Sequence, residues 1–245
     1  GGAIAAARYL RRTTQVERHE RTLPGSDPGP VDRPAPGDPA ALQRRADGVG
    51  ASVRRLYAVR VRDPRLGPAE VIDAIARDPN LGSPYELARF VKTRGLLGEM
   101  RPGDEYVVWL PGPWNGPVRV ADRTATAIRL VTLRGHMEAG EIEFRATGDG
   151  GDLVFEIESA ARSGTTGSWL VYALLRLGRE VQLHMWAQFC SSVARLAGGT
   201  TADPVTVRTT RYPDDHGGLS RPASRRAMRA FARLQGRRSN FDPAG

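Results

Sequence analysis

The sequence predicts an α+β fold in which a curved antiparallel sheet wraps around a long C-terminal helix. Three observations support this prediction. Short segments with alternating apolar and polar residues follow one another over residues 104–159, a long stretch with helical apolar spacing comes after them, and strands and helices fall into separate groups. The 245 residues are enough for one such domain with an extension at each end.

The first half of the domain contains one strand and two helices in this prediction. Residues 56–61 alternate as LYAVRV and predict a strand. A helix runs from Pro68 through Ile75, because proline is tolerated in the first helical turn. A second helix is expected to be capped by Ser83 and to continue through Val91.

The second half is predicted to hold five strands and the long helix. The pair Asn115-Gly116 is typical of a two-residue hairpin turn. The helix begins at residue 165 or 168 and ends near Leu196, before two glycines that favour a helix end. The strands are expected at residues 104–110, 117–121, 126–134, 140–146 and 152–159.

Both ends are predicted to lie outside the domain. Residues 1–45 are interpreted as an N-terminal helix over residues 1–23 followed by a linker over residues 24–39, which hold six of the 18 prolines. Residues 200–245 are rich in Arg, Pro and Gly, which predicts a basic, disordered tail. The domain itself therefore spans residues 46–199.

The net charge of +9 is concentrated in these ends. Residues 1–55 carry +4 and residues 198–245 carry +5, whereas residues 56–197 are neutral. A neutral body argues against binding of nucleic acid, which needs a basic surface on the folded domain. The abundance of Arg with Ala, Gly and Pro indicates a GC-rich bacterial genome. The single cysteine excludes a disulfide framework and a cysteine-rich metal site, and no phosphate-binding loop is present, so neither metal nor cofactor is expected.

Two interpretations of the first residues remain open. Residues 1–10 are either part of a surface helix or the end of a membrane helix, with Arg11 and Arg12 on the cytoplasmic side. The second interpretation predicts a cytoplasmic protein that is anchored to the inner face of the membrane by a helix upstream of Gly1, and its basic segment would then touch anionic lipid.

Four longer motifs add a family resemblance. They are GPWNGPV at residues 112–118, TLRGHMEAGEIEF at 132–144, FEIESAARSG at 155–164 and REVQLHMWAQFC at 179–190. Together they resemble an uncharacterised bacterial family, the domain of unknown function numbered nineteen-ninety, over about residues 46–199. That family is placed in the START-like (helix-grip, polyketide cyclase-like) superfamily. The resemblance implies a cavity between the sheet and the long helix, and it implies no established substrate or catalytic residue.

Gln182 is the central candidate for a ligand-binding residue. On a helical wheel it lies in the middle of the apolar face of the long helix, together with Met185, Trp186 and Phe189. A buried amide needs partners for two donors and one acceptor. Either the backbone or water supplies them, or Gln182 faces a cavity and holds the polar end of a ligand whose apolar part touches the aromatic residues.

Four more residues complete the predicted site. Thr132 points inward from its strand, and His136 lies in the turn that follows. Trp114 lies in the Pro-rich hairpin, where it either covers the cavity mouth or packs on its own strand, and Trp109 lies in the adjoining strand. The carboxylates of Glu141 and Glu143 are predicted to point away from the core and to form cross-strand ion pairs, so no catalytic residue is assigned.

The first functional hypothesis is a binding module for a small apolar or amphipathic molecule. An enzyme of the cyclase or hydrolase-like START-like type is the alternative, and a protein that docks on a membrane surface through its basic ends is the third. Two inward-facing titratable groups within hydrogen-bond reach of one point would favour an enzyme.

Overall fold

The computed structural model describes residues 15–27, 33–84, 88–109, 116–164, 169–201 and 203–213, and in the long helix it describes side chains from Gln182 onward. In this part of the chain there are two α-helices, α2 (Pro68–Arg77) and α3 (Trp169–Ala197), and three short 3-10 turns, η1 (Pro39–Ala41), η2 (Arg45–Asp47) and η3 (Pro79–Leu81). The strands are β1 (Val16–Thr22), β2 (Val49–Val61), β3 (Arg89–Arg94), β4 (Glu105–Trp109), β5 (Gly116–Arg123), β6 (Ala127–Thr132), β7 (Glu138–Asp149), β8 (Asp152–Ser163) and β9 (Val205–Tyr212).

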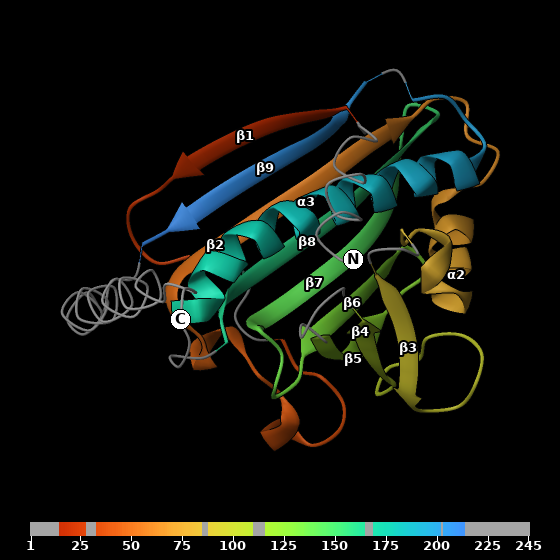
Figure 1. Cartoon of the computed structure of the whole chain (residues 1–245). Coiled ribbons are helices and arrows are strands. Elements are labelled where there is room, and N and C mark those ends of the chain that lie inside the picture. Colours follow the sequence, from red (N-terminus) through yellow and green to blue (C-terminus); the bar gives the residue numbers. More distant parts are fainter. Residues whose placement is uncertain are drawn as a thin grey trace, which may run out of the picture.

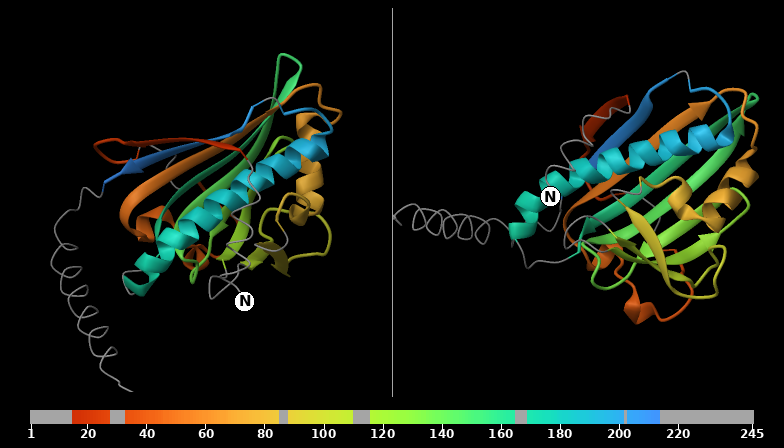
Figure 2. Two further views of the ribbon diagram at one scale, coloured as in Figure 1. Left: turned by 45° about the horizontal axis from the view of Figure 1, so that its top comes forward. Right: turned by 45° about the vertical axis from the view of Figure 1, so that its right-hand side comes forward.

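The described strands form one sheet in the order β1-β9-β2-β8-β7-β6-β5-β4-β3. All neighbours are antiparallel except β1 and β9, which run parallel. The sheet is strongly curved, and α3 lies diagonally across its concave face (Figure 1). Two further views show the central strands bending around this helix, with α2 beside its C-terminal end (Figure 2). The predicted α+β helix-grip fold is therefore confirmed.

The core lies between α3 and the central strands. Inward residues alternate along β2, where Tyr57, Val59 and Val61 are buried, and the same alternation buries Leu153, Phe155 and Ile157 on β8. The helix ends where predicted, because Gly198 has a φ of +76°, a conformation that glycine adopts without steric cost.

Most of the predicted elements are present. The strands predicted from residue 56 to 61 and from residue 104 to 159 correspond to β2 and to β4 through β8, and the helix predicted from Pro68 is α2. The Asn115 turn lies outside the described residues, although Gly116 pairs with Val108 across the hairpin.

The predicted helix over residues 1–23 is wrong for Val16–Thr22, which form β1. This strand pairs with β9 at one edge of the sheet, so its backbone groups are bonded on one side only. Its residues are mostly exposed, and charged side chains are tolerated on an edge strand because both faces are open to water there. Helix propensity is a weak preference that such pairing overrides.

Two further predictions are wrong for similar reasons. Residues Arg89–Arg94 form β3 instead of continuing a second helix, because Phe90 is buried by the sheet while its neighbours pair with β4. Residues Val205–Tyr212, expected in a disordered tail, form β9, and Val205 and Val207 are buried in the core. Strands from both predicted extensions thus join the sheet, and the outer limits of the domain remain a prediction.

The convex face of the sheet is covered in part by the Pro-rich segment. Arg119, only 2% exposed, donates to Glu105 and to the carbonyl oxygens of Pro36 and Asp38 at 3.1 Å. Arg129 donates to the carbonyl of Pro34 at 2.8 Å. The described part of the predicted linker, residues 24–27 and 33–39, carries no α-helix or strand, and only Pro39, in η1, has regular structure. Arginines of the sheet nevertheless bind this segment.

No helix within the described ranges is long and apolar enough to cross a membrane. Residues 1–14 and 214–245, which are the outer parts of the two basic ends predicted to contact a membrane, lie outside those ranges.

Candidate functional site

Gln182 of α3 faces the concave side of the sheet and bonds two charged side chains. Its Oε1 accepts a hydrogen bond from Nη1 of Arg55 on β2 at 3.2 Å, and its Nε2 donates to Oε2 of Glu138 on β7 at 3.1 Å. The amide therefore bridges a cation and an anion that belong to different strands.

The direction of the Gln182 amide follows from these partners. A guanidinium offers only donors and a carboxylate only acceptors, so turning the amide over would place donor against donor and acceptor against acceptor. The sequence left two possible partners for this amide, either backbone or water, or a ligand. The structure shows a third: the charged side chains of Arg55 and Glu138 bind it.

A pocket of about 30 Å³ opens beside this bridge. The inner face of β2 and β8 changes along the strands, from the large apolar residues of the core to small and polar ones near Gln182. The pocket is lined by Ala51, Val53, Arg55, Glu138, Ser159, Ala161, Arg162, Ser163 and Gln182. Its volume matches one or two water-sized groups, so a larger molecule would place only its polar end there.

The aromatic residues predicted to line the site pack closely against the sheet. Trp186 and Phe189, 6% and 0% exposed, contact the ring of Phe144 at centroid distances of 5.5 and 5.4 Å, and Phe189 stacks on Phe155 at 6.2 Å. Met185 is buried in the same core cluster. The expected orientation of these residues toward Phe144 and Phe155 is observed, and their rings form a core next to the polar pocket.

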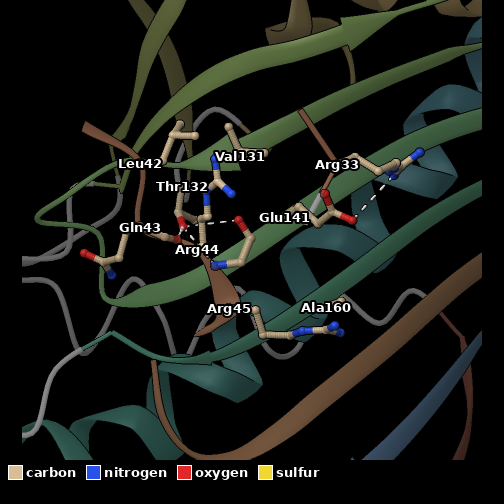
Figure 3. A pocket seen from close by; sticks show the side chains of 10 residues that line it. Arg33, Leu42, Gln43, Arg44, Arg45, Val131, Thr132, Glu141 and Ala160 are labelled. Atoms are coloured by element: carbon tan, nitrogen blue, oxygen red, sulfur yellow. Dashed lines mark hydrogen bonds and ion pairs between the residues drawn. The ribbon is translucent and has the colours of Figure 1, made fainter. Parts of the chain in front are cut away.

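Thr132 lies at a second pocket, on the other side of the sheet. Its hydroxyl donates to the carbonyl of Gln43 at 2.6 Å and accepts from the backbone N–H of Gly140 at 2.9 Å. This pocket holds about 20 Å³, and Figure 3 shows arginines around it. Two of these are paired, Arg33 with Glu143 at 2.6 Å and Arg45 with Asp27 at 2.7 Å. The structure thus does not bring Thr132 together with Gln182.

His136 lies next to Glu138 but not in the Gln182 pocket. Its Nδ1 accepts from the backbone N–H of Glu138 at 2.9 Å, and its ring lies against Gly116, where a Cβ atom would come within 2.6 Å of Nε2. Burial lowers the pKa of His136, although the Glu138 carboxylate acts in the opposite direction. The imidazole therefore fixes the start of β7, from which Glu138 reaches Gln182.

The remaining predicted residues lie elsewhere. Trp109 is 52% exposed at the end of β4, four strands away from β8, and Trp114 lies outside the described residues.

Cys190 is fully buried, and burial raises the pKa of its thiol, which keeps it protonated. Among the described residues, no three His, Cys, Asp or Glu side chains are grouped so that they could hold a metal ion.

The ion pairs predicted for the outer face are present. Arg145 binds Glu156 at 2.6 Å and Glu143 at 3.3 Å, and Arg129 binds Glu141 at 3.0 Å. Arg129 is only 3% exposed, so this part of the face is covered rather than solvated.

Sequence reasoning missed the two charged partners of Gln182. Tyr57, Val59 and Val61 alternate on the inner face of β2, and the same alternation puts Arg55 on that face. On β7 the inward positions Ile142 and Gly140 lead in the same way to Glu138. Both signals were in the sequence, because the strands continue past the ends that their apolar residues indicate.

Comparison with known proteins agrees with the resemblance. Residues 93–192 match the family described as "Domain of unknown function (DUF1990)". No curated protein matches the chain.

Solved structures that are similar to the chain include the following three. The di-domain ARO/CYC StfQ from the steffimycin biosynthetic pathway shares 13% identity at a TM-score of 0.43, over 63% of this chain and 52% of that one. Ginseng major latex-like protein 151 from Panax ginseng shares 8% at 0.43, over 60% and 97%. CalU16 from Micromonospora echinospora shares 15% at 0.33, over 60% and 84%. The chain thus spans about half the length of the di-domain protein, and the fold assignment rests on its own strand order.

Proposed function

We propose that the protein binds a small amphipathic molecule between the sheet and α3, with the polar end of the molecule at Gln182. One observation carries this proposal: the amide of Gln182 is held between Arg55 and Glu138 beside an open pocket with a floor of small residues. Convergent polar groups next to apolar walls are the usual composition of a small-molecule site.

The position of the pocket supports an amphipathic ligand in particular. Arg55 and Glu138 lie on one side, and the ring cluster around Trp186 and Phe189 lies further along α3. A polar end at the charged residues leaves the rest of the molecule to pass the apolar side chains of Ala51, Val53 and Ala161.

Native mass spectrometry of the purified full chain tests the proposal. We expect the wild type to carry a small molecule that a denaturing spectrum lacks, or to take one up from a panel of lipids and polyketides. Gln182→Leu removes the bridge, and Ala161→Leu fills the pocket without touching the bridge, so both variants should lose the ligand. Gln188→Leu, a matched change on the same helix, should retain it.

The stability of each variant has to be measured alongside. Gln182→Leu leaves two charged groups without their amide partner, which is expected to cost about 1–3 kcal/mol of folding free energy. The proposal fails if no variant or wild type binds any member of the panel, and the assigned site is wrong if all four proteins bind equally.

An enzyme is the second candidate, favoured by the convergence of Arg55 and Glu138 on one amide. In that function Glu138 would take a proton from a carbon next to a carbonyl group and return it. The test is deuterium exchange into 2,4-pentanedione in D₂O. Exchange that is catalysed by the wild type and not by Glu138→Gln supports an enzyme, and exchange at the rate of buffer with both proteins supports a binding module.

A further inference from the structure

The loop between β3 and β4, residues 95–104, presents two adjacent leucines to solvent. Leu96 is 71% exposed and Leu97 is 96% exposed, which makes them the most exposed of the large apolar side chains in the described part of the chain. The loop lies at the outer edge of the molecule, beside α2 (Figure 1). Single exposed apolar residues are common on protein surfaces, but an adjacent pair forms a local apolar patch, the Leu96–Leu97 tip.

The inner side of this loop is anchored to the domain. Nζ of Lys92 on β3 donates to the backbone carbonyls of Leu96 at 2.7 Å and Glu99 at 2.9 Å. The backbone N–H of Met100 donates to the carbonyl of Ala76 on α2 at 2.7 Å, and the Met100 side chain is buried in the core. The loop thus contributes its own apolar residue to the core and leaves the two leucines outside.

Two glycines fix the backbone on either side of the leucines. Gly95 has a φ of +109° and Gly98 a φ of +103°, a region that residues with a Cβ rarely adopt. At Gly95 a Cβ atom would also come within 2.0 Å of Oδ1 of Asp104, so only glycine fits there. The exposure of the tip therefore follows from a defined loop conformation.

Exposed arginines flank the Leu96–Leu97 tip on both sides. The side chains of Arg94 and Arg101 are 73% and 59% exposed, and they lie 3.6 Å from Glu105 and 3.5 Å from Glu99. Closer arginines of β5 already bind both carboxylates at 2.7 Å, Arg119 and Arg123. The two outer guanidinium groups therefore remain available to anionic groups outside the protein.

This combination suits a lipid bilayer better than a protein partner. A stable protein interface buries about 800 Å² on each partner, and its central part is depleted in charged residues. Here the apolar surface consists of two side chains between charged ones. A bilayer accepts a small apolar group between its headgroups, and the phosphates of anionic lipids accept hydrogen bonds from arginine.

We infer that the Leu96–Leu97 tip inserts into the surface of an anionic lipid bilayer, with Arg94 and Arg101 at the headgroup phosphates. This contact differs from the one expected through the basic ends of the chain. It is also independent of the proposed function, because the tip and the Gln182 pocket share no residue.

Co-flotation of the full chain with vesicles of phosphatidylcholine and phosphatidylserine in equal parts tests the inference. The double variant Leu96→Ser/Leu97→Ser should bind about tenfold or more weakly than the wild type, because burial of even one leucine side chain corresponds to about that factor. Arg101→Gln should weaken binding about fivefold. Trp109→Ser, which removes an exposed apolar side chain at the opposite end of β4, is the control and should bind like the wild type.

A fluorescent dye at the tip reports insertion directly. Cys190 is fully buried and burial raises the pKa of its thiol, so a thiol-specific nitrobenzoxadiazole dye labels the introduced cysteine of Leu97→Cys selectively. We expect its emission to rise and to shift to shorter wavelength when the vesicles are added. The same dye in Thr22→Cys, on the exposed strand at the opposite edge of the sheet, should show no change.

The inference is wrong if the wild type does not float with these vesicles, or if the dye at residue 97 stays in water. It is equally wrong if the double leucine variant binds like the wild type, because the basic ends of the chain then make the contact. A loss of binding in Trp109→Ser as large as in the leucine variant would also overturn it. None of these results bears on the proposed function, which the lipid and polyketide panel tests separately.

Discussion

Phe189→Ala tests whether the C-terminal half of α3 is closed core or cavity wall. The Phe189 ring is fully buried and packs against three other rings, those of Phe144, Phe155 and Trp186, at centroid distances of 5.4, 6.2 and 5.8 Å. Removal of such a ring costs its transfer free energy and also the dispersion attraction between the ring and the side chains around it, about 4 kcal/mol in total. Against a total stability of about 5–15 kcal/mol, this is a large fraction.

Urea unfolding followed by circular dichroism measures the effect of Phe189→Ala. In a thermal scan the same loss of about 4 kcal/mol should lower the melting temperature by roughly 8–16 °C for a domain of this size. Leu97→Ala is the control, because Leu97 is 96% exposed and its truncation should change stability by less than about 0.5 kcal/mol. A loss below about 1.5 kcal/mol for Phe189→Ala would show that the ring borders a void, and would refute the close packing described above.

Three further predictions concern groups away from the pocket. Arg119→Ala should cost about 3 kcal/mol in urea unfolding, because it leaves Glu105 without its buried partner; a change under about 1 kcal/mol would contradict this. Burial lowers the pKa of His136 from 6.5, so the folded protein takes up a proton there less readily than the unfolded chain. The free energy of unfolding should therefore be full above pH 6.5 and should fall as the pH drops below that value. His136→Asn should weaken this dependence of stability on pH, and an equal dependence in both proteins would assign it to other groups. Burial alone would lower the pKa of Lys92, but its hydrogen bond to Asp104 at 2.7 Å helps to raise it. Lys92, the only lysine, should therefore react with an amine-specific reagent far more slowly than the N-terminus, as followed by mass spectrometry. Rapid labelling of Lys92 in the native protein would show that this ion pair opens readily.

The central sheet and α3 could be predicted because their sequence patterns are local. Alternation buries Phe144 and Ala146 on β7 and Leu153, Phe155 and Ile157 on β8. The spacing of Met185, Trp186 and Phe189 places them on one side of α3. Each pattern is strong within a dozen residues, and tertiary contacts reinforce it.

The edge strands could not be predicted, because long-range pairing decides them. Val16–Thr22 carries charge at most positions and forms a strand only because Val205–Tyr212, almost 190 residues later, lies beside it. Arg89–Arg94 follows a proline and a serine that are typical of a helix start, yet its backbone bonds are made by β4.

The candidate site was predicted in part for the same reason. Helical periodicity alone identified Gln182 as an amide on an apolar face. Its partners Arg55 and Glu138 lie 127 and 44 residues away along the chain, and their meeting depends on the register of β2, β8 and β7. A charged residue at the end of a strand looks like the start of a loop until the length of that strand is known.

The most direct test of the binding site is a nitrogen–proton NMR titration of the full chain with decanoate. Buried Nε–H and side-chain amide protons exchange slowly with water, so separate signals are expected for Arg55 and Gln182. The account predicts that both signals shift and saturate together as decanoate is added, and that the Ala161→Leu variant, whose pocket is filled, shows neither shift. Saturating shifts confined to other parts of the chain, with the Arg55 and Gln182 signals unmoved, would contradict it.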